Sequence, residues 1–528
     1  MDIGTEKMKF FWSLLIPILV FCAFTYYLIG VNFSAKLGLI DDHEIAMFLG
    51  SDGEIKPSEI PGMILSTEVG NYGQALRYRP AYYSLRIIET ALWRDKAILW
   101  YAVRFFFFVT SMYLLWKIAR FFFPTLIAYL SVPYLFTLTF WPDIMTRLGP
   151  AEIYAVPAMI MSVYGLIEIL RSGKHGWWPM TIGYLICAGS KENFVILLLP
   201  ILAVAIYRWS QKKINRAELM AYLICLAMTL FITIEIVSAT SVNHADVYGS
   251  TISYKARVLK LWEYKRYIVV TRKLYLIIAA GLVFGLTWLR QLWRQGIRKA
   301  LANPVFTHFV VMGIVGVIIV SQYLFYDNGL PMNMRYDFPG MPLFSVLNLI
   351  IVHLLLNLLP KRKWWYLLGK MSIYSVVAGY SLYVIVSSGY SHIRMSAKAN
   401  AAATVRFDES LQVVVAKLQI DPNLPLLMIS NNYLDYEPIV SISRFLAAKK
   451  VSNPLILDYR EPTEYEKNSL SQALVPQLLR IEQNGSESPT SIFAHFSPLS
   501  RLTADTPCYS ITFGKQVLPT PCTNLTSF

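Results

Sequence analysis

Long apolar runs separated by short polar segments make up most of the chain. A run of about 17 to 25 apolar residues is long enough to cross a bilayer as an α-helix. We expect about eleven such spans, which predicts an α-helical polytopic membrane protein. The runs fall near residues 10–31, 98–117, 121–140, 151–170, 177–190, 193–208, 217–240, 271–290, 304–326, 339–359 and 364–388.

The pattern changes after about residue 390, where polar residues become frequent and the apolar runs become short. Runs typical of strands occur at 424–429, 454–458, 491–496 and 509–513, and helical patterns occur at 436–449 and 464–483. Strands that alternate with helices favour an α/β fold. We therefore expect a transmembrane domain at 1–390 and a small α/β domain at 391–528.

The composition agrees with a membrane protein. Hydrophobic residues make up 55% of the chain and charged residues only 15%, and a soluble domain could not bury so much apolar surface. The net charge of +15 would suggest nucleic acid as a partner of a soluble protein. Here the positive-inside rule explains it, so we expect no nucleic-acid partner. The basic residues that we assign to cytoplasmic loops are Lys117, Arg120, Arg171, Lys174, Arg208, Lys212, Lys213, Arg216, Arg290, Arg294, Arg298, Lys299, Lys361, Arg362 and Lys363.

This distribution of charge predicts the orientation of the chain. The N-terminus lies in the cytoplasm, and the first span is too long for the core of a cleaved signal peptide. An odd number of spans then places the C-terminal domain outside. The long first outer loop, at 32–97, lies on the same outer side as every motif described below.

Three carboxylates and an imidazole stand together just after the first span, in Asp41-Asp42-His43-Glu44. Such a cluster beside a bilayer is costly unless it is used, and we interpret it as the catalytic centre. The alternative is helix capping, with Asp41 or Asp42 at the N-cap and Glu44 completing a capping box. Capping alone would need only one of these carboxylates.

Arginines follow in two further outer segments. Arg77 and Arg79 stand among tyrosines, a combination that suits a phosphate or a sugar, because guanidinium groups bind phosphate oxygens and aromatic rings stack on sugar faces. The alternative is an aromatic belt with snorkelling arginines. After the third span come Arg147 and Glu152, which could bind substrate or simply pair with each other.

The later outer segments add more charge. The dipeptide Lys191-Glu192 lies between two short spans, where such charges are expensive unless they are paired or hydrated. The outer loop at 241–270 is basic against the general pattern and contains Lys255 and Arg257. An anionic lipid phosphate would explain that violation, and an amphipathic helix on acidic lipids is the alternative. Arg335 and Tyr336 precede a helix-starting proline, which suits an anion site, although Asp337 could neutralise Arg335.

Carboxylates, arginines and aromatic residues on the outer side of a membrane core suit sugar transfer from a lipid-phosphate donor. The phosphate leaves as an anion and needs cations, and a carboxylate can take a proton from the acceptor hydroxyl. An O-antigen polymerase or ligase would instead rely on arginines in a large loop between later spans. A lipid-linked sugar flippase would carry charges at mid-membrane depth and repeated halves, and Glu168 and Glu235 are the few intramembrane candidates.

The order of these motifs resembles the GT-C superfamily of integral membrane glycosyltransferases, in particular its bacterial members that use polyprenyl-phosphate sugars. The resemblance rests on Asp41-Asp42-His43-Glu44, Arg77-Tyr78-Arg79-Pro80, Arg147-Leu148-Gly149-Pro150-Ala151-Glu152, Lys191-Glu192 and Arg335-Tyr336. It covers about residues 10–390 and implies a module of the first seven spans, with interfacial helices in the first outer loop.

The resemblance also implies roles for these residues. Asp41 or Asp42 would be the general base of an inverting transfer, with Glu44 beside it, and we favour Asp41 as the first acidic member of the family's pair. The donor phosphate would bind Arg335, Tyr336, Lys191, Lys255 and Arg257. The sugar or acceptor would contact His43, Arg77, Arg79, Arg147, Glu152 and Glu192.

The expected partners are a polyprenyl-phosphate sugar donor, a glycan or lipid-linked acceptor, and membrane lipids. So acidic a site could also accept a divalent metal, but cationic side chains can do the same work. We therefore expect no obligatory metal. The resemblance to bacterial enzymes implies the inner membrane, with the active site on the periplasmic side and a role in building cell-envelope polysaccharides.

Overall fold

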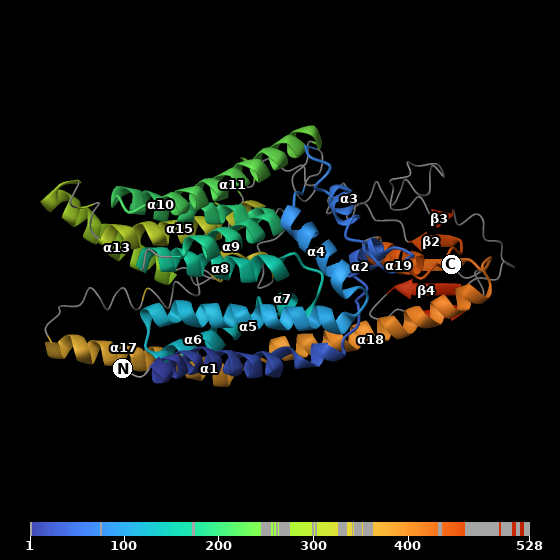
Figure 1. Ribbon diagram of the computed structural model, residues 1–528, viewed down its shortest axis with the longest axis horizontal. Helices are drawn as coiled ribbons and strands as arrows, with labels where there is room; N and C mark the ends of the chain where they lie inside the picture. The colour runs from blue at the N-terminus through green and yellow to red at the C-terminus, as the bar shows by residue number, and fades with distance from the viewer. Residues whose placement is uncertain are drawn as a thin grey trace.

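A computed structural model gives the fold of the chain (Figure 1). The structure describes residues 3–73, 77–171, 175–243, 275–297, 304–325, 335–340, 363–430 and 436–459. It also describes 255–256, 258–259, 262, 300, 342, 351 and the strands at 496–497, 509–513 and 518–521. The described part is mostly helical. Its long apolar helices run along the long axis of the molecule, and a β-sheet lies at one end (Figure 1).

Six helical segments in the described residues are long and apolar enough to cross a membrane, namely Leu14–Ser34, Ala97–Phe122, Glu152–Arg171, Glu192–Ser210, Arg216–Val242 and Tyr366–Ile420. The last segment contains two consecutive helices, Lys363–Ser388 and Ser391–Ile420. The six segments correspond to predicted spans 10–31, 98–117, 151–170, 193–208, 217–240 and 364–388. The spans predicted at 121–140 and 304–326 correspond to shorter apolar helices, Thr125–Phe136 and Phe309–Gln322. The span predicted at 339–359 falls almost entirely outside the described residues. These helices therefore support an integral membrane protein, whereas the number of eleven spans stays a prediction.

The helices of this region, in chain order, have the following bounds. They are α1 (Ile3–Ile29), α5 (Ala97–Phe122), α6 (Thr125–Phe136), α8 (Glu152–Arg171), α9 (Trp177–Ser190), α10 (Leu198–Ser210), α11 (Arg216–Asn243), α13 (Tyr275–Gln295), α15 (Pro304–Phe325) and α17 (Lys363–Ser388). The 3₁₀ helix η2 (Glu192–Leu197) links α9 to α10, and η3 (Arg335–Asp337) follows α15.

Glycines bring α8 and α9 into backbone contact. A Cβ added to Gly183 would lie 2.4 Å from the carbonyl oxygen of Ala158, and one added to Gly165 would lie 2.4 Å from the backbone nitrogen of Met180. Small residues allow such close approach between membrane helices. The first turn of α8 therefore lies beside the residues that follow α9, which matters for the site described below.

The predicted first outer loop folds into short helices at one end of the bundle. These are η1 (Gly30–Ser34), α2 (His43–Leu49), α3 (Ile60–Leu65) and α4 (Pro80–Trp93), and α7 (Pro142–Thr146) lies between α6 and α8. Pro80 begins α4, where its missing N–H costs nothing. The apolar residues of α2, including Ile45 and Phe48, pack with Ile87 and Trp100 in one buried cluster. This packing fixes the start of α2, and with it the acidic stretch.

The C-terminal residues form a five-stranded sheet in the order β3-β2-β1-β4-β5. Its strands are β1 (Leu426–Ser430), β2 (Leu455–Tyr459), β3 (Phe496–Ser497), β4 (Tyr509–Phe513) and β5 (Leu518–Pro521). Strand β1 pairs in parallel with β2 and β4, and β5 runs antiparallel to β4. Helix α19 (Tyr436–Ala448) corresponds to the helix predicted at 436–449. The predicted helix at 464–483 lies outside the described residues, and the division at residue 390 stays a prediction.

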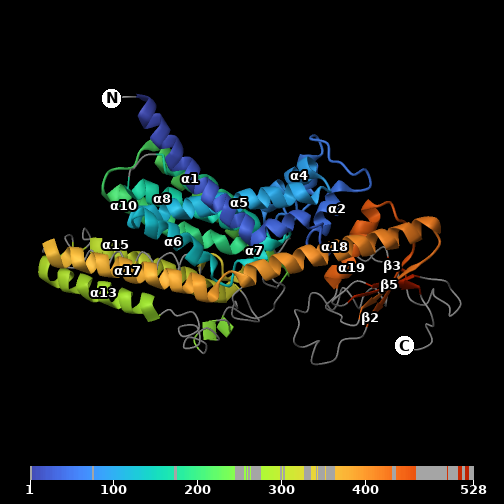
Figure 2. The ribbon, with the colours of Figure 1, turned by 90° about the horizontal axis from the view of Figure 1, so that it is seen from below.

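Sequence analysis missed one long helix, α18 (Ser391–Ile420), which connects the bundle to the sheet (Figure 2). Near its start, Ile393 and Ala397 lie in the main core of the bundle. Near its end, Leu411 and Leu418 pack in a second core with residues of α19 and β1. The apolar positions of α18 recur every three or four residues rather than forming a run, so they do not resemble a membrane span.

Candidate active site

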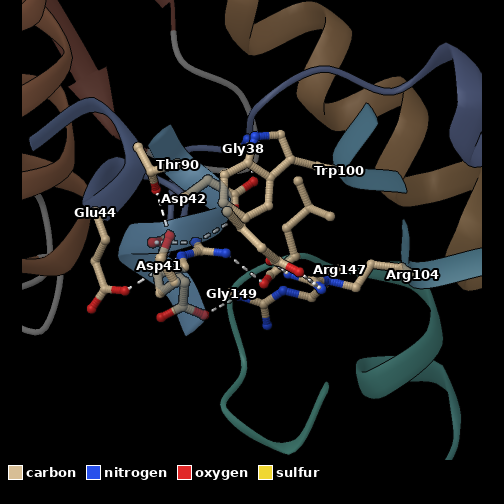
Figure 3. Close-up of polar contacts among 12 residues, drawn as sticks. Gly38, Asp41, Asp42, Glu44, Thr90, Trp100, Arg104, Arg147 and Gly149 are labelled. Atoms are coloured by element: carbon tan, nitrogen blue, oxygen red, sulfur yellow. Dashed lines mark hydrogen bonds and ion pairs between the residues drawn. The ribbon is translucent and has the colours of Figure 1, made fainter. Parts of the chain in front are cut away.

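Asp41 has a partly exposed carboxylate. Its Oδ2 accepts a hydrogen bond of 3.0 Å from Nη2 of Arg147 (Figure 3). The same oxygen lies 3.9 Å from Nη1 of Arg335. The side chain is 30% exposed. The backbone of Asp41 has φ of 68°, a left-handed conformation that aspartate tolerates better than most residues. Asp41 thus combines solvent access with two guanidinium groups.

Asp42 points the other way and is buried. Its Oδ2 accepts a hydrogen bond of 2.7 Å from the N–H of Gly38, and its Oδ1 lies 3.7 Å from Nη2 of Arg86. Burial raises the pKa of Asp42 to about 6, although Arg86 opposes the rise. Asp42 is the N-cap residue of α2, but no side-chain hydrogen bond caps the helix. The capping interpretation therefore does not account for the acidic stretch.

Glu44 is held by a tyrosine from α4. The hydroxyl of Tyr82 donates a hydrogen bond of 2.5 Å to Oε2 of Glu44 and lies 3.2 Å from the carbonyl oxygen of Gly149. Burial raises the pKa of Glu44, while Arg86 and Tyr82 act against the rise. Burial lowers the pKa of the neighbouring His43 to about 4, so this imidazole is neutral at physiological pH.

Arg86 is a buried residue of the site that sequence analysis missed. Its fully buried guanidinium donates hydrogen bonds to the carbonyl oxygens of Leu148, at 3.0 Å, and of Asp41, at 3.3 Å. It also lies 5.0 Å from the ring centroid of Trp100. Arg86 therefore joins the two loops that carry Asp41 and Arg147. The available signal was the polar series Tyr82, Arg86 and Glu89 at helical spacing, all of which are buried.

Gly149 allows these two loops to meet. A Cβ added to this glycine would lie 1.9 Å from Cβ of Asp41, a distance at which atoms overlap. Only glycine permits the observed approach without displacement of the acidic loop.

A second set of charges lies where α8 begins and α9 ends. Lys191 forms a buried ion pair with Glu152, and its Nζ lies 5.0 Å from the ring centroid of Tyr336. Nη2 of Arg335 lies 3.3 Å from the hydroxyl oxygen of Tyr336. The backbone contact between α8 and α9 explains this pairing. Arg335 connects the set to Asp41, so four separate segments meet here.

The suggested pair between Arg147 and Glu152 is wrong, because Arg147 bonds to Asp41 and Glu152 to Lys191. Arg79 instead pairs with Glu192, through contacts of 2.8 and 3.4 Å between guanidinium nitrogens and carboxylate oxygens.

The remaining predicted residues have different outcomes. Arg77 is half-buried in the first outer loop. Lys255 is exposed, and no described contact brings it to the site. Arg257 and the side chain of Asp337 lie outside what the structure describes. Within the described ranges, no group of three or more His, Cys, Asp and Glu side chains is arranged to hold a metal ion.

The charges of this site determine which chemistry it can perform. Arg147 and Arg335 supply positive charge beside the partly exposed carboxylate of Asp41, and Lys191, paired with Glu152, adds a further cation next to Tyr336. Such an arrangement can bind an anionic group and accept a proton beside it.

Comparison with known proteins bears on this chemistry. Residues 82–236 match a family described as dolichyl-phosphate-mannose-protein mannosyltransferase, which belongs to the GT-C superfamily of membrane glycosyltransferases. No curated protein matches the chain. The matched segment runs from α4 into α11 and includes Arg86, Arg147, Glu152 and Lys191. The resemblance to the GT-C superfamily is thus confirmed, and the match indicates a membrane glycosyltransferase of the GT-C type.

Proposed function

We propose that this protein transfers a sugar from a polyprenyl-phosphate donor to an extracytoplasmic glycan or lipid-linked acceptor, with inversion at the anomeric carbon. Asp41 would be the general base. The observation that carries the proposal is the accessible Asp41 carboxylate beside Arg147 and Arg335. The description of the matched family names a lipid-phosphate sugar and a transferase, which supports a donor of this class.

The donor phosphate would bind to the cationic side chains of Arg335 and Lys191. Arg335 offers guanidinium donors next to the Tyr336 hydroxyl, and Lys191 adds an ammonium group. These charges would stabilise the phosphate as it leaves with the bonding electrons of the glycosidic bond. Glu152 would keep Lys191 in place and offset its charge in the unliganded site. No step requires a metal in this scheme, because protein cations neutralise the leaving group.

Asp41 would take the proton from the acceptor hydroxyl while the hydroxyl oxygen attacks the anomeric carbon. A single displacement from the face opposite the phosphate inverts the configuration at that carbon. Arg147, at 3.0 Å, would hold the carboxylate in position for this transfer. Asp42 is an unsuitable base because its carboxylate is buried and accepts a backbone N–H.

The test is transfer of radiolabelled sugar by purified protein from a panel of polyprenyl-phosphate donors. Asp41→Asn should reduce turnover by at least about 100-fold while donor binding survives, since general-base catalysis contributes about 10² to 10⁴. Asp42→Asn should keep most of its turnover. Asp52→Asn is the matched control, because Asp52 is an exposed carboxylate of the same loop.

Two results would count against the proposal. If Asp41→Asn retains full turnover while Asp42→Asn loses it, the base is Asp42. If proteoliposomes move the lipid-linked sugar across the membrane without forming a glycosylated product, the protein is a flippase rather than a transferase. The same vesicles, assayed from each side, would also test the predicted orientation in a bacterial inner membrane.

A further inference from the structure

Three consecutive buried residues follow helix α9, and each binds a different segment of the chain. Lys191 has an extended backbone, with φ of −153° and ψ of 132°, and the 3₁₀ helix η2 begins directly after it. Lys191 and Glu192 form the ion pairs described above. The third residue, Asn193, is 3% exposed, and its Nδ2 donates a hydrogen bond of 2.8 Å to the carbonyl oxygen of Phe338. Asn193 therefore connects the end of α9 to the segment that carries Arg335.

A second buried amide, that of Gln322 near the end of α15, binds the same segment at two backbone positions. Its Nε2 donates a hydrogen bond of 3.2 Å to the carbonyl oxygen of Tyr336, and its Oε1 accepts one of 3.2 Å from the N–H of Gly340. The approach is close, because a Cβ added to Gly340 would overlap Oε1 of Gln322. Gln322 therefore joins α15 to both halves of the segment 335–340.

The side chain of Phe338 anchors the middle of this segment. It is fully buried, and its ring centroid lies 5.1 Å from that of Phe140 and 5.5 Å from that of Trp141, directly before α7. Buried backbone groups need hydrogen-bond partners, and Asn193 and Gln322 supply them to this segment. Three separate parts of the chain thus hold the backbone of 335–340 in place.

The segment 335–340 carries two groups of the proposed donor site. Nη1 of Arg335 lies 3.9 Å from Oδ2 of Asp41, and its Nη2 lies 3.3 Å from the hydroxyl oxygen of Tyr336. The ring centroid of Tyr336 lies 5.0 Å from Nζ of Lys191. A guanidinium group binds phosphate through directional, bidentate hydrogen bonds. The contribution of Arg335 therefore depends on where its backbone is held.

We propose that Asn193 and Gln322 are positioning residues for the donor phosphate, because they fix the backbone of 335–340 and so keep Arg335 beside Asp41. The inference rests on the proposed function, since it takes Arg335 as a phosphate ligand. Both amides bond to backbone atoms of the segment, so they act through Arg335. Oδ1 of Asn193 is buried and has no hydrogen-bond partner among the described residues. Such an oxygen is unfavourable, so stability alone does not explain an asparagine here.

Binding of a sugar-free polyprenyl phosphate to the full-length protein in nanodiscs tests this role. The corresponding polyprenol, which lacks the phosphate, is the reference ligand. Gln322→Met keeps the length of the side chain but removes both hydrogen bonds, and Asn193→Leu keeps the volume but removes one. Each should weaken binding of the polyprenyl phosphate about tenfold, which corresponds to about 1.4 kcal/mol, and leave binding of the polyprenol unchanged. In transfer assays the donor KM should rise by the same factor, and the acceptor KM should not change.

A double-mutant cycle shows whether the effect depends on Arg335. Arg335→Ala should itself weaken binding of the polyprenyl phosphate. Adding Gln322→Met to this variant should weaken binding by less than about twofold more, because the group that Gln322 positions is already absent. The effects of two independent sites would multiply instead.

Matched controls separate positioning from a general loss of structure. Asn453 is also buried, and its Nδ2 donates hydrogen bonds of 2.8 and 2.9 Å to two backbone carbonyl oxygens of the C-terminal region. Asn453→Leu should lower the unfolding temperature without changing phosphate binding. Gln291→Met, at a half-buried position of α13, is the control for Gln322→Met. If Gln322→Met fails to fold, Asn193→Leu decides the question, because it also removes the unpaired oxygen.

Two results would overturn the positioning role. These are wild-type affinity for the polyprenyl phosphate in both variants, or effects of Gln322→Met and Arg335→Ala that multiply. The failure of the proposed function would look different. Phosphate binding that depends on Gln322 and Arg335, without transfer from any donor, would leave the positioning role standing and remove the proposed function. Transfer that depends on Asp41, with a donor KM insensitive to Gln322 and Asn193, would leave only the proposed function.

Discussion

Replacement of Arg86 is the sharpest test of how the loop that carries Asp41 is held in place. Its guanidinium is fully buried and donates to two backbone carbonyl groups, those of Asp41 and Leu148. Hydrogen bonds from a charged donor contribute about 1.5 to 3 kcal/mol each, so removal of both costs about 3 to 6 kcal/mol. Arg86→Met keeps much of the volume but removes the charge and both bonds.

The loss should appear mainly in turnover. A misplacement of about 1 Å at a reacting group can cost about 100-fold in rate, and we expect a fall in kcat of that size. The donor KM should change little, because Arg86 is buried and does not reach the proposed phosphate site. The kcat of Arg86→Lys should lie between those of the wild type and Arg86→Met. A single ammonium group cannot donate to both carbonyl oxygens, which lie 3.0 and 3.3 Å from the guanidinium nitrogens of Arg86.

The assay combines initial rates at saturating donor with thermal unfolding of each variant. Arg94→Lys is the control, because Arg94 pairs with Glu54 at 3.0 Å at an exposed position. Exposed pairs are worth about 0.2 to 1 kcal/mol, so this variant should resemble the wild type. Wild-type kcat in Arg86→Met, or a loss of donor binding equal to the loss of kcat, would refute the positioning role.

Three further predictions follow from the same geometry. Gly149→Ala should reduce turnover strongly with little change in unfolding temperature, because the added Cβ would displace Asp41; normal turnover would contradict this. Removing Lys191 alone should destabilise the fold by about 3 to 5 kcal/mol, and the double change Glu152→Gln with Lys191→Met should restore stability but not donor binding. Burial raises the pKa of Glu68 from 4.5 to about 7, so the folded protein binds this proton more tightly than the unfolded chain. The wild type should therefore lose stability relative to Glu68→Gln as pH rises from about 5 to about 8, and a difference in unfolding temperature that is independent of pH would contradict this.

The convergence of the outer motifs could be anticipated from the sequence. Asp41, Arg147, Lys191 and Arg335 are far apart in the chain, yet each follows or precedes an apolar segment at the same predicted end. Charged groups cannot remain in the apolar part of a bilayer. They therefore gather at the few polar positions that the bundle offers at that end, and the structure brings these four together.

The individual pairings could not be anticipated. Arg147 and Glu152 are neighbours in sequence, but Arg147 follows α7 in an extended conformation, whereas Glu152 lies in the first turn of α8. Which charge each one meets depends on the α8 and α9 contact. Arg86 was missed for a related reason. Its guanidinium donates hydrogen bonds to backbone carbonyl groups of two distant loops. Contacts of this kind cannot be predicted from the local pattern of side chains.

Helix α18 has a mechanical consequence for the enzyme. It is continuous over 30 residues, which corresponds to about 45 Å at 1.5 Å per residue. One end packs in the core of the bundle and the other in the core beneath the sheet, so the length of the helix sets the distance between these two cores. One inserted residue would turn everything beyond it by about 100° and would disturb the packing of α19 against α2. The length of this helix therefore contributes to the geometry of the site, as the side chains of the site do.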